Sequence, residues 1–239
     1  MPSGSSSWTW NEIAPFARIL ADLGAPSVVC GGQAVAFWAA RFGLGAIVSR
    51  DLDVLGERDG ADRLAATLGG TIQYPHRYEM TVLAAVIRTT WRGRPLDIEW
   101  LHSVPGIEAD PEAISVLADL GEGHLLRVLH PVPLAAAKLH AIRFFDQRGR
   151  NDAAHLKVVV QVIGYRVTEE LDLNPALALG FIHRWYRAAR LHGNRRVLAE
   201  LAIDWRHAVP VEELHRRASR DPRVARFLSE HWPRLSAEI

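Results

Sequence analysis

Two aspartates stand in a short segment that otherwise reads as a β-strand, Asp51-Leu52-Asp53-Val54-Leu55-Gly56. Aspartate is disfavoured in strands, so two in one strand suggest a role other than packing. Strand residues i and i+2 point to the same face, about 6.5–7 Å apart. Asp51 and Asp53 are therefore expected to project together, with Leu52 and Val54 facing a core. Such a pair suits Mg²⁺, which is usually bound by one or two carboxylates and substrate phosphates; an isolated pair of this kind also occurs as surface decoration.

A pair of glycines, Gly31-Gly32, follows an apolar strand predicted over residues 27–30 and precedes a helix predicted over residues 33–42. Glycines at this place let the backbone approach a ligand closely, and a helix N-terminus attracts anions. A phosphate held there would lie beside a metal held by Asp51 and Asp53. The alternative interpretation is a plain tight turn that needs a positive φ angle.

A third carboxylate is available in the predicted strand over residues 94–101, which carries Asp97 and Glu99. Arg92-Gly93 predicts a hairpin that joins this strand to the β-rich run over residues 79–91. We prefer Asp97 as the third acid, because its neighbours are apolar like those of Asp53. Glu99 is the fallback, and solvent-facing acids are the alternative for both.

The remaining patterns predict an α+β fold, with a small mixed β-sheet and flanking helices followed by a mostly helical C-terminal region. The expected organisation is a disordered leader over residues 1–8, a core over 9–130 and a helical domain over 131–239. Further helices are predicted over residues 10–23, 61–68, 133–145, 151–163, 175–191 and 197–201, and a further strand over 124–130.

Composition narrows the class of protein. The 239 residues are 49% hydrophobic, which is ordinary for a globular chain. Apolar runs stop well short of 18 residues, so no membrane partner is expected. The start, MPSGSSSW, lacks the basic and apolar regions of a signal peptide. A single cysteine, Cys30, fits a reducing compartment, and we predict a cytoplasmic location.

The C-terminal part is basic: residues 181–239 contain 12 arginines and 7 acidic residues. Such a balance is compatible with nucleic-acid or phosphate partners. Arg184, Arg187 and Arg190 follow one another at three-residue spacing around Trp185 and Tyr186. They form either a basic stripe with aromatics for RNA or, as the favoured alternative, a solvated helix face.

Together these motifs resemble the nucleotidyltransferase superfamily with a polymerase-β-like core. The motifs are Gly31-Gly32-Gln33-Ala34, then Ser49-Arg50-Asp51-Leu52-Asp53-Val54, then Asp97 on a later strand. Lys138-Leu139-His140-Ala141 and, more loosely, Arg148-Gly149-Arg150-Asn151-Asp152 are similar to the segment that follows the core in AbiEii-type (MenA-like) toxins. The resemblance covers roughly residues 28–160. Asn151 departs from a lysine that is common at its position in that family.

This resemblance implies transfer of a nucleoside monophosphate from an NTP to an acceptor hydroxyl, with release of pyrophosphate. It implies Asp51, Asp53 and Asp97 as ligands of Mg²⁺, or of Mn²⁺ as the alternative ion, and Asp97 as the group that takes the acceptor's proton. The nucleotide contacts that it implies are Gly31, Gly32, Ser49, Arg50, Lys138 and Asp152. Lys138 would supply charge to the triphosphate, while Asp152 would fix Lys138 or the nucleotide, or cap the helix that begins there.

The acceptor and the partners stay open at this stage. The resemblance implies RNA, with the tRNA 3′ end as one example, or a protein as acceptor, and raises a toxin with a cognate antitoxin as a hypothesis. Alternatives are transfer to a small aminoglycoside-type compound, a non-catalytic nucleotide-binding relative, and a metal-dependent glycosyltransferase. The early position of the aspartate pair argues against the last of these.

Overall fold

The computed structural model describes residues 7–24, 26–107 and 113–237. Its strands are β1 (Trp8–Thr9), β2 (Ser27–Val29), β3 (Val48–Ser49), β4 (Asp51–Gly56), β5 (Thr71–Gln73), β6 (Leu83–Trp91), β7 (Arg94–Leu101), β8 (Ser115–Asp119) and β9 (Leu125–Leu129). Its α-helices are α1 (Trp10–Asp22), α2 (Gly31–Arg41), α3 (Arg58–Leu68), α4 (Pro131–Phe144), α5 (Asp152–Leu173), α6 (Pro175–Arg190), α7 (His192–Glu200), α8 (Val211–Ala218), α9 (Pro222–Arg226) and α10 (Trp232–Ala237). A 3₁₀ helix, η1 (Trp205–Ala208), and a π-helical turn, η2 (Phe227–His231), complete the set. The predicted α+β class is confirmed.

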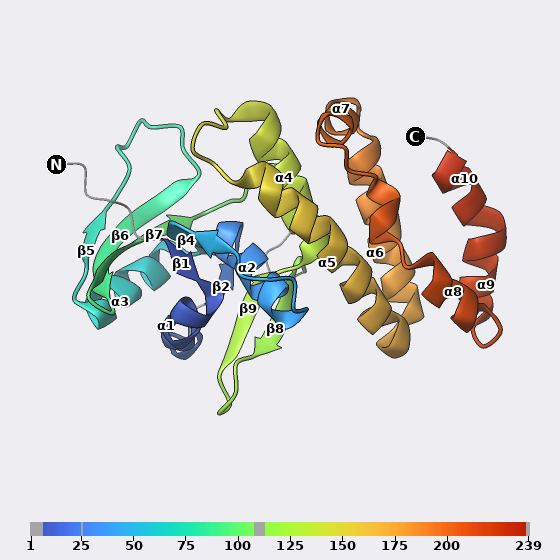
Figure 1. The fold of residues 1–239 in the computed structure, drawn as a ribbon. Coiled ribbons are helices and arrows are strands. Elements are labelled where there is room, and N and C mark those ends of the chain that lie inside the picture. Colours follow the sequence, from blue (N-terminus) through green and yellow to red (C-terminus); the bar gives the residue numbers. More distant parts are fainter. Residues whose placement is uncertain (1–6, 25, 108–112, 238–239) are drawn as a thin grey trace. The chain divides into compact units, whose positions relative to one another are not determined.

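The chain divides into two compact units, residues 1–134 and 135–239. In the first unit, seven strands form one mixed sheet in the order β5-β6-β7-β4-β2-β9-β8, and β1 and β3 form a separate two-stranded ribbon. Helix α1 packs against β9, α2 against β4 and α3 against β6 (Figure 1). The second unit is helical, and α5 packs against both α6 and η1.

The sheet core of the first unit follows the alternation of the two central strands. Leu52 and Val54 of β4 and Ile98 and Trp100 of β7 are fully buried. The two strands run parallel, and Leu52 pairs with Ile98 while Val54 pairs with Trp100. Paired residues of neighbouring strands project to the same face, so the apolar residues of both strands fill one face and leave the intervening acidic residues on the other.

Most predicted elements lie where the sequence places them, with two informative differences. The hairpin at Arg92-Gly93 is present, and both residues adopt positive φ angles, 49° and 74°. The glycine pair is not a turn before α2 but its first two residues. Helix α5 continues to Leu173, ten residues beyond its predicted end, and it packs against α6 and η1.

The predicted leader is wrong at its last residue. Trp8 belongs to β1, is fully buried and pairs with Ser49 of β3. The Arg94 guanidinium lies 3.8 Å from the centroid of the Trp8 ring, a cation–π contact. Residues 1–6 of that predicted leader lie outside the described residues.

Candidate active site

The two aspartates of β4 share the face of the sheet opposite to its buried apolar residues, as predicted. The register of β4 and β7 places Asp51 beside Asp97 and Asp53 beside Glu99. All four acids therefore project from the same face of two adjacent strands. Both Asp97 and Glu99 remain structurally eligible as the third carboxylate.

Asp53 is placed against the start of α2. A Cβ atom added to Gly31 would overlap the Asp53 carboxylate, and Gly31 has a φ angle of +59°. The backbone N–H of Cys30 donates to the Asp53 carbonyl oxygen at 2.9 Å, which ties the start of the helix to β4. A carboxylate in this position is favoured by the helix dipole, and the glycine is required by both its backbone angle and this contact.

Asp51 is oriented by a neighbouring hydroxyl. Ser49 is buried, and its Oγ donates to Asp51 Oδ1 at 3.1 Å. Arg50 lies between the two residues in the bend that separates β3 from β4, and its side chain is exposed. Ser49 thus contacts a predicted metal ligand directly.

Asp97 is the most exposed of the four acids, and it forms an ion pair with Arg88. Its Oδ1 lies 3.9 Å from Arg88 Nε, and the two side chains are 56% and 58% exposed. A pair this open and this long contributes little to stability, so it leaves the Asp97 carboxylate accessible.

Within the described residues, no group of three or more His, Cys, Asp or Glu side chains is placed to hold a metal ion. The oxygen donors of Asp51 and Asp53 nevertheless suit Mg²⁺, which commonly takes one or two protein carboxylates and completes its shell with substrate phosphates and water. The donor set therefore fits an ion that arrives with a nucleotide better than a resident ion in a protein cage.

Lys138 and Asp152 meet in the helical unit. Lys138 Nζ donates to Asp152 Oδ1 at 2.7 Å, and the two side chains are 10% and 4% exposed. Arg150 Nε donates to the other oxygen, Oδ2, at 2.6 Å. Burial by itself raises the pKa of Asp152, but Lys138 and then Arg150 outweigh that effect and hold the pKa below its usual value. Of the roles weighed for Asp152, fixing Lys138 is thus the one with a direct contact.

Two motif residues to which the sequence analysis assigned no role belong to these arrangements. Arg150 is the second partner of Asp152. The signal in the sequence was a basic residue two positions before Asp152. Gln33 is fully buried in the first turn of α2, and its Nε2 donates to the Trp8 carbonyl oxygen at 3.1 Å. A glutamine within the apolar run GGQAVAFW was the signal for this residue.

The structure favours the solvated helix face over the basic stripe with aromatics, the two interpretations given for α6. Arg184, Arg187 and Arg190 are exposed. Trp185 is fully buried and Tyr186 is 4% exposed, so neither ring is available to stack on a ligand. The three arginines are thus a row of solvated cations with no aromatic surface between them.

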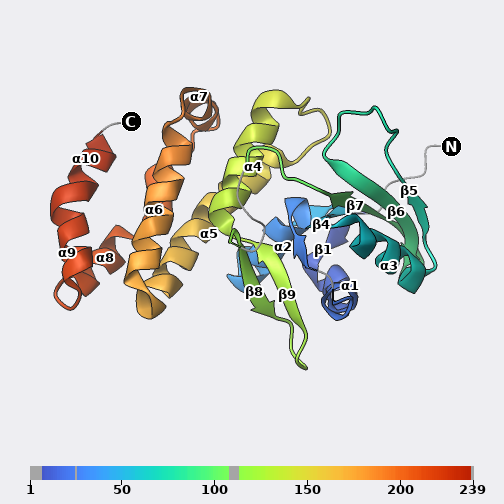
Figure 2. The ribbon, with the colours of Figure 1, turned by 180° about the vertical axis from the view of Figure 1, so that it is seen from behind.

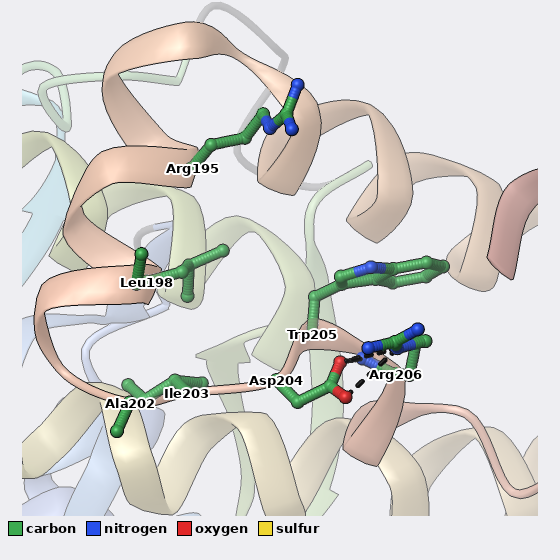
Figure 3. Close-up of a pocket in the computed structure, with 8 residues that line it drawn as sticks. Arg195, Leu198, Ala202, Ile203, Asp204, Trp205 and Arg206 are labelled. Carbon is green, nitrogen blue, oxygen red and sulfur yellow. Dashed lines mark hydrogen bonds and ion pairs between the residues drawn. The ribbon is translucent and has the colours of Figure 1, made fainter. Parts of the chain in front are cut away.

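Two pockets formed by described residues lie away from the predicted site residues. One of about 290 Å³ lies between α7 and η1 (Figure 3) and is lined by Arg195, Leu198, Ile203 and Trp205, among others. At its edge Asp204 accepts hydrogen bonds from Arg206 Nε at 2.8 and 2.9 Å. Another, of about 530 Å³, lies in the first unit beside Trp10, Arg18 and Arg41.

Formal charge is divided between the two units. Residues 1–134 contain 10 Lys and Arg against 15 Asp and Glu, and residues 135–239 contain 18 against 12. The first unit thus carries a formal charge of −5 and the second +6. Among the helices of the described residues, none has the length and apolar character needed to cross a bilayer.

The solved structures to which this chain is similar include the following two proteins. An antigenic nucleotidyltransferase-like protein from Paracoccidioides brasiliensis aligns over 74% of this chain and 94% of its own, with 11% identity and a TM-score of 0.46. JHP933 from Helicobacter pylori aligns over 87% of this chain and 94% of its own, with 12% identity and a TM-score of 0.39. No protein-family model matches the chain, and no curated protein matches it.

Proposed function

We propose that the chain is a metal-dependent nucleotidyltransferase that moves a nucleoside monophosphate from an NTP to an acceptor hydroxyl. The observation that carries the proposal is the placement of Asp53 against Gly31 at the start of α2, with Asp51, Asp97 and Glu99 on the same face of β4 and β7. This arrangement sets hard oxygen ligands beside the backbone N–H groups of a helix N-terminus. The oxygen ligands suit a divalent ion. The backbone N–H groups suit the phosphates of a nucleotide.

In the proposed reaction the acceptor oxygen forms a bond to the α-phosphorus, and the bond from that phosphorus to the bridging oxygen breaks. Pyrophosphate leaves, and the hydroxyl proton passes to a carboxylate, which we assign to Asp97. Bound Mg²⁺ would offset charge on the phosphate oxygens. Asp51 and Asp53 would hold the ion, and Ser49 orients Asp51 through its hydrogen bond.

For the nucleotide, we propose contacts with Gly31, Gly32, Ser49 and Arg50 of the first unit. Lys138 is proposed to add its charge to the triphosphate. Its ammonium group has three N–H donors, and the hydrogen bond to Asp152 uses one of them while fixing the side chain. Asp152 therefore acts on the nucleotide through Lys138 in this proposal.

The acceptor that we propose is RNA, in line with the +6 formal charge of the helical unit. The further proposal of a toxin neutralised by an antitoxin protein rests on the resemblance to AbiEii-type toxins. It predicts that induced expression arrests growth and that Asp51→Asn relieves the arrest. The −5 charge of the first unit would instead suit a cationic small molecule, so the test includes an aminoglycoside panel.

The experiment incubates the protein with each α-labelled NTP and Mg²⁺, in separate arms with total RNA, cell extract or aminoglycosides. We expect label transfer in one arm and a loss of about 100-fold or more in Asp51→Asn and in Asp53→Asn. Asp59→Asn is the matched control, because Asp59 is an exposed acid of α3 that pairs with Arg63. Absence of transfer with every NTP and acceptor, or equal transfer by Asp51→Asn, would overturn the proposal.

A further inference from the structure

Two adjacent phenylalanines are exposed at the end of α4. Phe144 is 59% exposed and Phe145 is 44% exposed. The ring of His140, one helical turn earlier, lies 4.5 Å from the Phe144 ring and 6.0 Å from the Phe145 ring, centroid to centroid. Three rings thus gather at one end of a helix while two of them face solvent. Neighbouring exposed aromatics of this kind indicate a binding surface more often than an isolated exposed ring does.

An arginine accompanies each phenylalanine. The Arg143 guanidinium lies 4.7 Å from the centroid of the Phe144 ring, and that of Arg150 lies 5.5 Å from the Phe145 ring. These are cation–π distances. A guanidinium beside a phenyl ring offers a flat surface for stacking and a charge for an anion at the same place.

Arg143 is held in position by neutral groups. Its Nη1 donates to Asn194 Oδ1 at 3.1 Å, and its guanidinium lies directly against the α-carbon of Gly193. Both partners lie in the first turn of α7, which is beside the end of α4 in both views of the ribbon (Figures 1 and 2). Among the described residues, Arg143 has no carboxylate partner, so its charge is not neutralised.

The neighbouring segments of the chain carry further cations, and Asp146, the exposed acid beside Phe145, pairs with Arg148. Arg190 at the end of α6 and Arg195 in α7 are exposed, and each is within three residues of Gly193 in the chain. Arg150 pairs with Asp152, but Asp152 also pairs with Lys138. One carboxylate therefore faces two cations, which leaves a net positive charge. The chemistry that complements this surface is therefore a flexible polyanion with flat apolar groups.

We propose that His140, Arg143, Phe144, Phe145 and Arg150 form an aromatic–basic surface that binds single-stranded nucleic acid. Bases stack on the two phenyl rings, and the guanidinium groups contact phosphates. A single strand is required because the faces of bases are covered by their neighbours in a duplex, whereas unpaired bases stack on aromatic side chains. The surface belongs wholly to the helical unit, so the inference does not depend on the proposed reaction.

The test measures fluorescence anisotropy of labelled oligonucleotides of about 12 nucleotides, as oligo(U), oligo(dT) and a duplex of equal length. We expect either single strand to bind at least about tenfold more tightly than the duplex. The ratio of oligo(U) to oligo(dT) affinity distinguishes RNA from DNA as the source of the strand. Failure of both single strands to bind, or equal binding of the duplex, overturns the proposal.

Variants assign the binding to these residues. The double variant Phe144→Ala, Phe145→Ala should bind about tenfold or more weakly at every salt concentration, and Phe144→Tyr, Phe145→Tyr should retain affinity. Tyr78→Ala is the matched control, because Tyr78 is 81% exposed and lies in the other unit. Equal affinity of the double alanine variant and the wild type would contradict the stacking role.

The salt dependence separates the roles of the arginines from those of the rings. Arg143→Gln should reduce the slope of log K against log salt by about 0.7, the value for one lost phosphate contact on a single strand. Arg220→Gln removes the same charge from an exposed position elsewhere in the helical unit and should leave the slope unchanged. An unchanged slope in Arg143→Gln would exclude its phosphate contact.

Asp51→Asn should bind like the wild type, so loss of transfer activity in that variant does not bear on this surface.

Discussion

The carboxylate of Asp53 lies in the space that a side chain on Gly31 would occupy. This contact joins the middle of β4 to the first residue of α2, two elements separated by a long connection in the chain. It explains why the helix begins with glycine although glycine is a poor helix former. It also makes the position of the carboxylate depend on the absence of a Cβ atom.

Gly31→Ala is therefore expected to destabilise the protein and to displace Asp53. Gly69→Ala is the matched control, since Gly69 has the same φ angle of +59° but open space around its α-carbon. The positive φ angle alone should cost about 1–2 kcal/mol in Gly69→Ala, and the overlap should add about 1–3 kcal/mol in Gly31→Ala. Urea denaturation measures both values, and equal losses would show that the Asp53 contact is not constraining.

The same pair of variants tests the proposed activity. Gly31→Ala should reduce nucleotide transfer by about 100-fold, because small displacements of a reacting group have effects of this size. Gly69→Ala should leave transfer near the wild-type level under conditions in which both variants are folded. Full activity in Gly31→Ala would remove Asp53 from the proposed site.

The third carboxylate can be assigned by substitution. Asp97→Asn is expected to lower kcat/KM for transfer by about 100-fold or more, as for loss of a general base, and Glu99→Gln by less than about tenfold. Arg88→Gln should not lower transfer, because its pair with Asp97 is long and exposed. The opposite ranking of the two acidic variants would assign the role to Glu99, which pairs in register with Asp53.

The buried pair of Lys138 and Asp152 should be strongly coupled. Lys138→Met is expected to cost about 3 kcal/mol of unfolding free energy, because it removes a partner from a buried carboxylate. Lys157→Met, at an exposed position of α5, should cost less than about 0.5 kcal/mol. A double-mutant cycle with Asp152→Asn should give a coupling of at least about 1 kcal/mol, and additive losses would contradict a direct interaction.

Asp152 also predicts an acid-dependent loss of stability. Its pKa is lowered in the folded state despite burial, because Lys138 and Arg150 favour the carboxylate. The stabilisation is complete above the unfolded pKa of about 3.9 and is lost as the pH falls below it toward the lowered folded value. Urea denaturation from about pH 6 to pH 3 should show a shallower decline in Asp152→Asn than in the wild type, and parallel curves would contradict the assignment.

His183 predicts pH dependence in a higher range. Burial first, and then the charges of His231 and Arg187, lower its pKa below the usual value. The unfolded chain therefore takes up a proton near pH 6.5 while the folded chain does not, so stability falls as the pH drops below that value. His183→Gln should flatten the unfolding free energy between about pH 7 and pH 5, and an unchanged dependence would assign it to other groups.

The structure corrects the sequence interpretation mainly where a residue's surroundings come from distant segments. Helix α5 extends past Gly164 and packs against α6 and η1, contacts that the local pattern does not contain. Trp8 belongs to β1 and pairs with Ser49, and Gln33 and Arg94, both distant in the chain, contact it. The tryptophan and tyrosine of α6 are buried, whereas the two exposed phenylalanines at the end of α4 each have an arginine beside the ring.

The sequence by itself determined the strands that carry the acids, because the alternation of apolar and acidic residues in β4 and β7 follows the two-residue period of a strand. It also determined the hairpin at Arg92-Gly93 and the helical character of the second unit. Only the tertiary structure decided that β4 and β7 pair in parallel with Asp51 beside Asp97 and Asp53 beside Glu99, and that Asp53 rests on Gly31. Register and contact between separate elements depend on how the whole sheet closes its core, and local periodicity carries no information about that choice.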